Sequence, residues 1–305
     1  MSEEEAPDEE QILLQLREFG VVLTDEIPYR VATLFPRLEG WGARGEVKRK
    51  AKLIRNVEPR LRAALNEGEQ VLFVSRGIQS SFTEGYFLGA WAHYINQTVF
   101  VLTNLRLIMF HSTSKGVPKA PNWMLFYSEI VDFQSSWTGM VTLRLQDGRK
   151  YRYSGFPKSD RKAMPAIFEE TLANYRALGF APEATQSREN LCNECFQVVP
   201  KARLECESCG TTFWAPTELA VRSLIFPSWG DFLMGHTMLA WFEVVGWLAT
   251  VGVCVGLMLA DNAARVPAIA FGLMIIAGSH ATDAGITYSI AKKGLHTKKR
   301  GDQQT

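Results

Sequence analysis

Two long apolar segments near the C-terminal end constrain this chain of 305 residues most strongly. Residues 238–260 and 266–290 are mostly apolar, and about 20 such residues are enough for a helix to cross the hydrocarbon core of a bilayer. The second segment becomes more polar from Ser279 onward. Because only residues 261–265 separate the two, we expect an antiparallel transmembrane hairpin over residues 238–291.

The charges at the two ends of the chain predict the orientation of this hairpin. Residues 1–10 form an acidic tail that we expect to be disordered. Because this start has no basic region followed by an apolar run, we expect no cleaved signal peptide. Residues 292–305 form a basic tail, and lysine and arginine favour the cytoplasmic side. We therefore expect a two-helix protein of the cell (inner) membrane, with lipids as partners and both termini in the cytoplasm.

Four cysteines stand just before the apolar segments, in two Cys-x-x-Cys pairs separated by ten residues: Cys192, Cys195, Cys206 and Cys209. In a reducing compartment such pairs hold metal more often than they form disulfides. We expect them to bind one structural Zn²⁺, because four thiolates leave no open position for catalytic water. A dithiol redox pair is the alternative, although the expected βαβ pattern is absent. The fifth cysteine, Cys254, lies in an apolar run and is expected to pack there.

The segment with the cysteines is similar to the short zinc ribbons that stand beside membrane segments in bacteria. We expect a linker over residues 181–190, the ribbon over 191–215, and a membrane-proximal segment over 216–237. Gly210 follows the last cysteine and suits a left-handed turn. Lys201 and Arg203 are offset by three nearby glutamates, so we do not expect nucleic-acid binding, and a membrane-tethered nucleic-acid-binding regulator is only a second alternative.

Residues 67–180 change from a strand pattern to a helix pattern. β-branched and aromatic residues dominate 70–74 and 98–110, and Asp147-Gly148 between two further apolar runs is a hairpin signal. Residues 158–178 then have apolar residues at helical spacing, and Gly179 is a suitable end. The pattern predicts an α+β domain, an antiparallel sheet closed by one C-terminal helix.

Three segments of this region resemble the pleckstrin-homology-like (PH-like) family, which includes GRAM and bacterial PH domains: Glu67-Gly68-Glu69-Gln70-Val71-Leu72, the run from Val99 to Phe110 (VFVLTNLRLIMF), and Tyr127-Ser128-Glu129-Ile130. The resemblance implies a PH-like antiparallel β-barrel with a C-terminal helix, in a multidomain chain, and a ligand that is a lipid, a peptide or another copy. It does not cover the aromatic-rich residues 80–97, which would be either extra core cover or an exposed contact.

Residues 11–66 predict a helical N-terminal segment, and its second half is strongly basic. Between residues 44 and 62 the basic residues alternate with apolar ones, which indicates either a solvated helix face or a helix lying on anionic headgroups. Six basic residues are candidate contacts for lipid or a partner: Lys48, Arg49, Lys52, Arg55, Lys115 and Lys119. The alternative is that they are ordinary solvated side chains.

Glu243, His280 and Asp283 lie inside the apolar segments, and ionisable residues at such positions suggest function. The leading hypothesis is nevertheless a non-enzymatic membrane adaptor or scaffold, because no nucleotide loop, nucleophile elbow or metalloprotease helix occurs. An intramembrane enzyme or proton-linked transporter that uses these three residues in an oligomer is the alternative. Gly252 and Gly256 would let another helix approach closely, which suits packing within the hairpin or between copies in a homo-oligomer.

Overall fold

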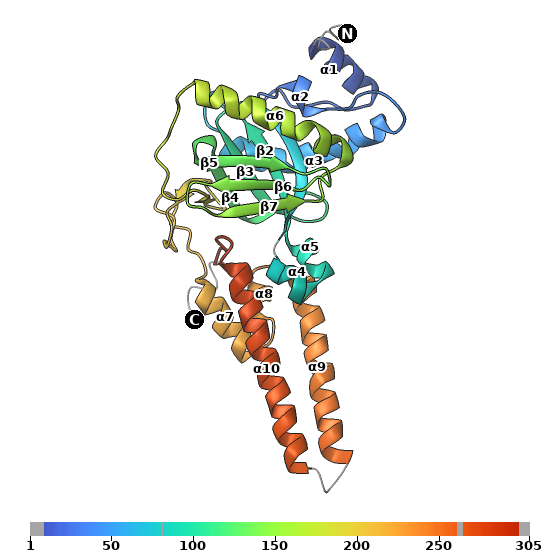
Figure 1. Cartoon of the computed structure of the whole chain (residues 1–305), viewed down its shortest axis with the longest axis vertical. Helices are drawn as coiled ribbons and strands as arrows, with labels where there is room; N and C mark the ends of the chain where they lie inside the picture. Colours follow the sequence, from blue (N-terminus) through green and yellow to red (C-terminus); the bar gives the residue numbers. More distant parts are fainter. Residues whose placement is uncertain (1–8, 81, 261–264, 299–305) are drawn as a thin grey trace. The chain divides into compact units, whose positions relative to one another are not determined.

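The computed structural model describes residues 9–80, 82–260 and 265–298, and the chain divides into two compact units, Met1–Gly210 and Thr211–Thr305 (Figure 1). Residues 1–8 of the predicted acidic tail, residues 261–264 and residues 299–305 of the predicted basic tail lie outside the described residues.

The first unit is built on an antiparallel sheet of nine strands in the order β5-β6-β7-β1-β2-β3-β4-β8-β9. Its strands are β1 (Val71–Ser80), β2 (Gln97–Thr103), β3 (Arg106–Ser112), β4 (Pro118–Phe126), β5 (Ile130–Ser135), β6 (Val141–Leu145), β7 (Lys150–Ser154), β8 (Glu189–Leu191) and β9 (Val198–Val199). Its helices are α1 (Glu9–Glu18), α2 (Val31–Leu34), α3 (Ala43–Ala64), α4 (Phe82–Leu88), α5 (Ala90–Ile95), the short η1 (Tyr127–Glu129) and α6 (Lys158–Ala177).

Strands β2 and β3 are buried on both faces, which explains their unbroken apolar sequence. Val99 and Val101 of β2 belong to a core that includes the apolar residues of α3, whereas Phe100 and Leu102 belong to a second core that includes those of α6. Successive side chains of a strand point to opposite faces, so one run supplies both cores. Strands β6 and β7 alternate buried and more exposed residues, as expected for strands covered on one face.

The α+β class, the antiparallel sheet and the single long helix after strand β7 agree with the sequence prediction. The predicted barrel is not observed, because the sheet is open, with β5 at one edge and β9 at the other. Strand β8 extends the sheet by pairing with β4, and β9 pairs with β8. The sheet therefore continues into the segments predicted as linker and zinc ribbon. The aromatic-rich stretch forms α4 and α5, where Ala92 and Ile95 are buried and Tyr86 is exposed.

A buried ion pair joins the segments that carry the PH-like resemblance. Arg106 donates from Nε to Glu69 Oε1 at 2.9 Å and from Nη2 to Glu69 Oε2 at 2.8 Å. The same guanidinium donates to the carbonyl of Ala64, the last residue of α3, at 2.7 Å. Thr103 donates its hydroxyl to Glu69 at 2.7 Å, and Tyr127 donates to the Thr103 carbonyl at 2.7 Å. The motif residues therefore fix the α3–β1 and β2–β3 connections.

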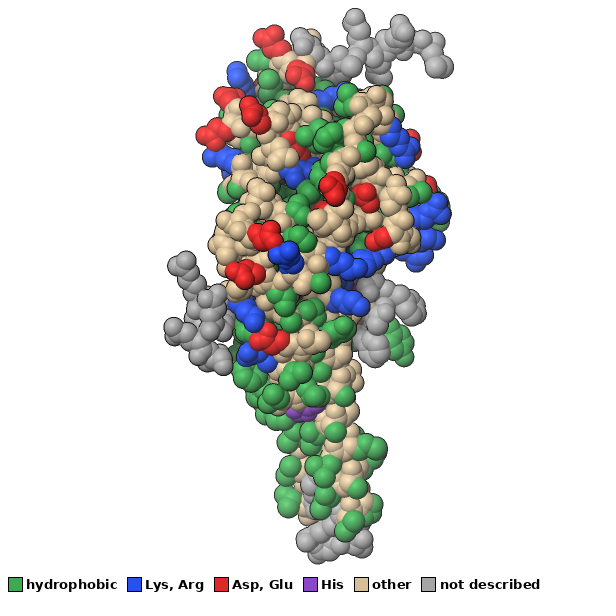
Figure 2. All heavy atoms as spheres, turned by 90° about the vertical axis from the view of Figure 1, so that its left-hand side faces the viewer, with side chains coloured by type: hydrophobic (Ala, Val, Ile, Leu, Met, Phe, Trp, Pro, Cys, Tyr) green, Lys and Arg blue, Asp and Glu red, His purple; other side chains and the backbone are tan. Residues whose placement is uncertain are grey.

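The second unit consists of helices: α7 (Pro216–Ile225), α8 (Trp229–Leu233), α9 (Thr237–Ala260) and α10 (Arg265–Ala291). Within α9 and α10, residues Thr237–Leu257 and Ile269–Ala291 are long and apolar enough to cross a membrane. Large apolar side chains such as Leu248, Val253 and Leu273 are exposed in this unit, and Figure 2 shows mostly hydrophobic side chains along these helices.

The buried pair of Glu69 and Arg106 generates a stability prediction. Arg106→Leu leaves the Glu69 carboxylate buried without its cation, and Glu69→Leu leaves the guanidinium unpaired. Each single substitution is expected to lower the free energy of unfolding by about 3–5 kcal/mol, and the double substitution by clearly less than the sum. Chemical denaturation of the full chain in detergent measures this.

The control is Arg62→Leu, because the Arg62–Glu26 pair in the same unit is about half exposed and is expected to contribute about 0–1 kcal/mol. An Arg106→Leu protein as stable as the Arg62→Leu protein would contradict the structural role assigned to the buried pair.

Candidate functional site

The four predicted cysteines form one cluster at the end of the first unit. Their sulfur atoms all lie within 4.8 Å of one another. Cys192 Sγ lies 3.5 Å from Cys209 Sγ, and Cys195 Sγ lies 3.5 Å from Cys206 Sγ. Four thiolates around Zn²⁺ at about 2.3 Å would stand roughly 3.8 Å apart in a tetrahedron, so the cluster fits a four-coordinate ion with little adjustment.

Each Cys-x-x-Cys pair closes a tight turn whose next residue has a positive φ. Gly210, after Cys209, has φ +70° as predicted, and its N–H donates to the Cys206 carbonyl at 2.8 Å. Phe196, after Cys195, has φ +57°, and its N–H donates to the Cys192 carbonyl at 3.2 Å. Phe196 is not a glycine, and its ring is held in the core beside Phe110, with centroids 6.2 Å apart.

The environment of the thiols favours a structural role over redox chemistry. Burial raises the pKa of the Cys192 thiol, and burial also raises the pKa of Cys195, to about 12. A reactive cysteine instead needs a lowered pKa. With no metal, these thiols hold their protons at neutral pH, so a bound cation has to displace them. Cys254 is buried, in agreement with a packing role.

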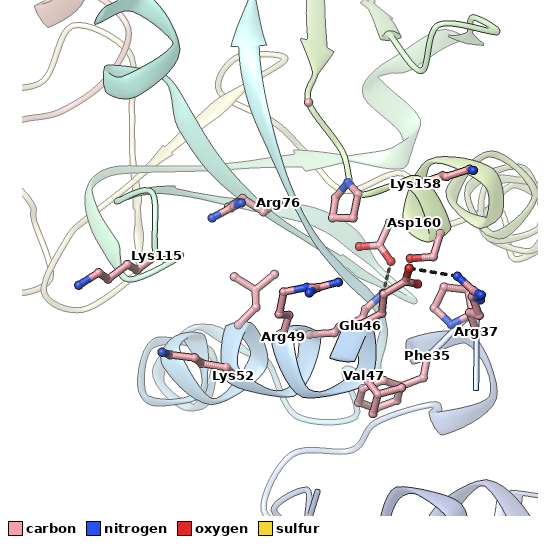
Figure 3. A pocket seen from close by; sticks show the side chains of 16 residues that line it. Phe35, Arg37, Glu46, Val47, Arg49, Lys52, Arg76, Lys115, Lys158 and Asp160 are labelled. Carbon is pink, nitrogen blue, oxygen red and sulfur yellow. Dashed lines mark hydrogen bonds and ion pairs between the residues drawn. The ribbon is translucent and has the colours of Figure 1, made fainter. Parts of the chain in front are cut away.

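A second candidate site is a basic pocket in the first unit, with a volume of about 560 Å³ (Figure 3). It is lined by α3, by Arg76 of β1, by Lys115 in the β3–β4 loop and by the start of α6. Of the six predicted contact residues, Arg49, Lys52 and Lys115 line the pocket, whereas Lys48, Arg55 and Lys119 do not. Sequence analysis missed Arg76 and Lys158, whose place beside α3 depends on the tertiary fold.

Two internal ion pairs lie in the wall of this pocket. Lys50 donates to Asp160 Oδ1 at 2.7 Å, and Ser75 donates its hydroxyl to Asp160 Oδ2 at 2.7 Å. Burial lowers the pKa of Lys50 to about 8, although Asp160 opposes the shift, and the ammonium also lies 3.9 Å from the centre of the Phe73 ring. Arg37 pairs with Glu46 at 3.1 Å. The contacts of Asp160 hold α3 against β1 and α6, whereas the Arg37–Glu46 pair joins α3 to the segment that precedes it.

The apolar face of α3 is not free to lie on a membrane. Val47, Ile54, Val57 and Leu61 are all buried in the core against the sheet. The interleaved apolar residues of this basic stretch therefore pack inside the protein. On α3, only the exposed arginine and lysine side chains can therefore contact anionic groups.

In the second unit, two of the three predicted polar residues of the hairpin come together. Ser228 donates its backbone N–H to Asp283 at 2.7 Å and its hydroxyl to Glu243 at 2.8 Å. The third member of the group is Asp231 rather than His280: carboxylate oxygens of Asp231, Glu243 and Asp283 all lie within 4.8 Å of one another. His280 Nδ1 lies 2.9 Å from the Leu224 carbonyl oxygen.

Asp231 is fully buried in α8, and burial raises its pKa to about 7. Its Oδ2 accepts a hydrogen bond from Thr287 at 2.9 Å. Sequence analysis missed this residue because it lies before the predicted span, in the short stretch Trp229–Leu233. An acidic residue between tryptophan and phenylalanine was the one signal that could have indicated it.

Comparisons with known proteins identify no family for this chain. No protein-family model matches it, and no curated protein matches it. Among solved structures, it is similar to the crystal structure of the C-terminal domain of an unknown protein from Leishmania infantum. The two share 16% identity over 39% of this chain and 94% of that chain, with a TM-score of 0.27, a similarity too low to support a fold or a function.

The cysteine cluster generates a prediction about metal content. Full-length protein purified without chelator is expected to contain one metal ion per chain, and Cys206→Ser is expected to lower this content below one half, because three thiolates and a hydroxyl form a much weaker site. Inductively coupled plasma mass spectrometry of both proteins measures it.

Cys254→Ser is the control, since Cys254 lies outside the cluster. A Cys206→Ser protein that retains as much metal as Cys254→Ser would rule out the four-cysteine site.

Proposed function

We propose that this protein is a non-enzymatic integral membrane adaptor of the bacterial inner membrane. Helices α9 and α10 would form a transmembrane hairpin with both chain ends in the cytoplasm. The first unit, with the sheet and the four cysteines, would stand on the cytoplasmic face and bind a ligand or a partner there.

The observation that carries this proposal is the exposure of the apolar side chains of the two long helices. Only 22% of the most apolar window in α9, and 11% of that in α10, is buried within the protein. The core helix of a soluble protein buries its apolar side chains, whereas those of Leu248, Val253 and Leu273 are more than half exposed. An exposed apolar surface of this size needs an apolar environment, and two such helices in sequence fit a bilayer.

The cytoplasmic orientation rests on the reduced cysteines and on the basic end of the chain. Lys292, Lys293 and Lys298 follow α10 directly, and basic residues next to a span favour the cytoplasmic side. Thiolate metal ligands also suit a reducing compartment.

Zn²⁺ is the ion we propose for the cysteine cluster. Four thiolates in a tetrahedral arrangement suit zinc or an iron–sulfur centre, and closely spaced sulfurs about 3.5 Å apart suit a single ion. With all four positions occupied by sulfur, the ion would fold and stiffen residues 192–209, which end the first unit just before the helical unit begins.

We also propose that residues 67–180 are related to the PH-like domains that their sequence resembles. The residues shared with that family meet around the buried Glu69–Arg106 pair, and α6 packs its apolar residues Met164, Phe168 and Leu172 on one face of the sheet. These features support a binding domain. The added strands β8 and β9 and the helix α3 would be particular to this chain.

The membrane proposal predicts how the protein fractionates. Wild-type protein is expected to stay in the pellet when membranes are washed with alkaline carbonate. The double variant Val253→Arg, Leu273→Arg places one charge in the apolar part of each helix. Each charge costs up to about 2.5–3.5 kcal/mol within a span, so a large fraction should move to the supernatant or be degraded.

Trp137→Arg, a change to the same residue type at a position 94% exposed in the first unit, is the control and should fractionate as wild type. Wild-type protein that carbonate releases completely would overturn the membrane proposal.

A second candidate function is proton-linked transport through an oligomer of the hairpin. It is favoured by the convergence of Glu243 and Asp283 of the candidate spans with Asp231 of α8, because carboxylates within membrane spans can carry protons. Two helices are a small scaffold for such a path, which is why this function ranks second.

Proteoliposomes with a pH gradient and a trapped pH-sensitive dye distinguish the two functions. An adaptor is expected to dissipate the gradient no faster than empty liposomes do. Proton flux that Asp283→Asn abolishes, and that Asp147→Asn in the β6–β7 turn leaves unchanged, would instead establish the transport function.

A further inference from the structure

The basic pocket of the first unit holds a surplus of positive charge. Seven basic and two acidic side chains line it. Glu46 and Asp160 are already paired with Arg37 and Lys50 inside the protein. The remaining five basic side chains have no ion pair within the described part of the chain: Arg49, Lys52, Arg76, Lys115 and Lys158.

These five cations come from four separate elements. Arg49 and Lys52 are on α3, Arg76 is on β1, Lys115 is in the β3–β4 loop, and Lys158 begins α6. In Figure 3, Arg49 extends into the middle of the pocket, while the ammonium groups of Lys52, Lys115 and Lys158 lie around its edge. Like charges repel one another, so this collection is stabilised when an anion binds among them.

The backbone around the pocket is held in place, so the cations do not depend on a flexible loop. Asn56 of α3 donates its side-chain amide to the Lys115 carbonyl at 3.0 Å. Gly116 then has φ +75°, and a Cβ atom there would collide with Leu53 of α3. Arg76 donates to the carbonyl of Ser114 in the same loop. The loop thus lies directly against α3 and β1, the elements that with the loop itself carry four of the five cations.

We propose that this pocket binds a small anion carrying two or more phosphate groups. The guanidinium groups of Arg49 and Arg76 suit bidentate contacts to phosphate oxygens, and lysines at the rim act as mobile point charges. One phosphate would leave most of the charge unbalanced, whereas two or three would balance it. The volume of about 560 Å³ lies within the range of small-molecule pockets, about 300–1,000 Å³.

Apolar side chains also line part of the pocket. Phe35, Val47 and Leu53 line it beside the charged groups. Such a mixture suits an organic phosphate, whose carbon skeleton contacts the apolar side chains while its phosphates meet the cations. Because α3 supplies both cations and apolar wall, the pocket exists only through the helix that precedes the PH-like region.

This inference assigns a ligand class to the binding role proposed above, and it rests on that role. The phosphates could belong to a soluble metabolite or to the headgroup of a lipid, since the same oxygen chemistry serves both. Isothermal titration calorimetry of the full chain, held in phosphatidylcholine nanodiscs, separates these sources with two probes: tripolyphosphate and the deacylated headgroup of cardiolipin, bis(glycerophospho)glycerol, which carries two phosphates.

Binding of either probe, at least tenfold tighter than that of inorganic monophosphate, is the expected result. A headgroup that binds more tightly than tripolyphosphate would identify a lipid as the source, and the reverse order would identify a soluble phosphate. Affinity is also expected to fall as salt is raised. Failure of both probes to bind at millimolar concentration would overturn the proposal.

The decisive comparison uses two double variants of α3 with the same change in charge. Arg49→Glu with Lys52→Glu is expected to weaken binding at least tenfold, because both side chains line the pocket. Lys48→Glu with Arg55→Glu changes two exposed residues of the same helix that do not line it, and should weaken binding less than threefold. Equal losses in the two proteins would show nonspecific attraction and overturn the pocket.

A third variant tests whether the site includes more than α3. Lys115→Glu alters a different element and should also weaken binding several-fold, with unchanged circular dichroism. Carbonate extraction of the same proteins keeps the two proposals apart. Protein that remains in membranes but binds neither probe would refute the pocket and support the membrane anchor. Protein that carbonate extracts but that still binds a probe would refute the membrane anchor and support the pocket.

Discussion

The buried contact between Glu69 and Arg106 is the interaction on which the first unit depends. Arg106 stands at the start of β3, and its two hydrogen bonds to Glu69 are joined by a third to the end of α3. Both side chains are almost fully buried, with 6% of Arg106 and none of Glu69 exposed. A charge pair removed from water is tolerable only when its remaining donors and acceptors are satisfied, and here Thr103 and the backbone of Asn66 satisfy Glu69.

The consequence of this pair is that α3 cannot be separated from the sheet. The carbonyl of Ala64 accepts from Arg106, so the helix ends where the sheet begins. From that point α3 runs back along the sheet and buries its apolar side chains against one face, while α6 covers the other. Strands β2 and β3 are therefore apolar on both sides. The exposed face of α3 is left basic, and it becomes a wall of the pocket.

The sequence predicted those features that depend on local patterns. The two apolar segments and the two Cys-x-x-Cys pairs indicated the long helices and the sulfur cluster, since each pattern follows from local geometry. The strand runs and the helix after Gly155 were also predicted, because alternation and helical spacing are local signals. Gly210 adopted the left-handed conformation that its position after Cys209 required.

Features that depend on long-range packing could not be predicted from one sequence. Nothing near Lys50 indicates that its partner is Asp160, which lies 110 positions away. The same holds for Arg76 and Lys158, which reach the pocket only once α3 has packed on the sheet. The open sheet was missed for a similar reason: β8 is three residues long, too short for a periodic signal, and it is a strand only because β4 offers a free edge.

The placement of acidic residues explains why the pocket remains positively charged. Glu46 and Asp160 are both used in internal ion pairs, one at the rim and one buried below it. Burial lowers the pKa of Lys50 to about 8, and Asp160 opposes this shift and so favours the charged ammonium. Both acidic groups of the pocket are thus used in pairs with Arg37 and Lys50, and the other cations that line it have no ion-pair partner among the described residues. A protein that needed only a stable surface would intersperse both signs of charge there. Cations that line a pocket without ion pairs repel one another and so destabilise the folded protein. Binding of an anionic ligand among them offsets this repulsion.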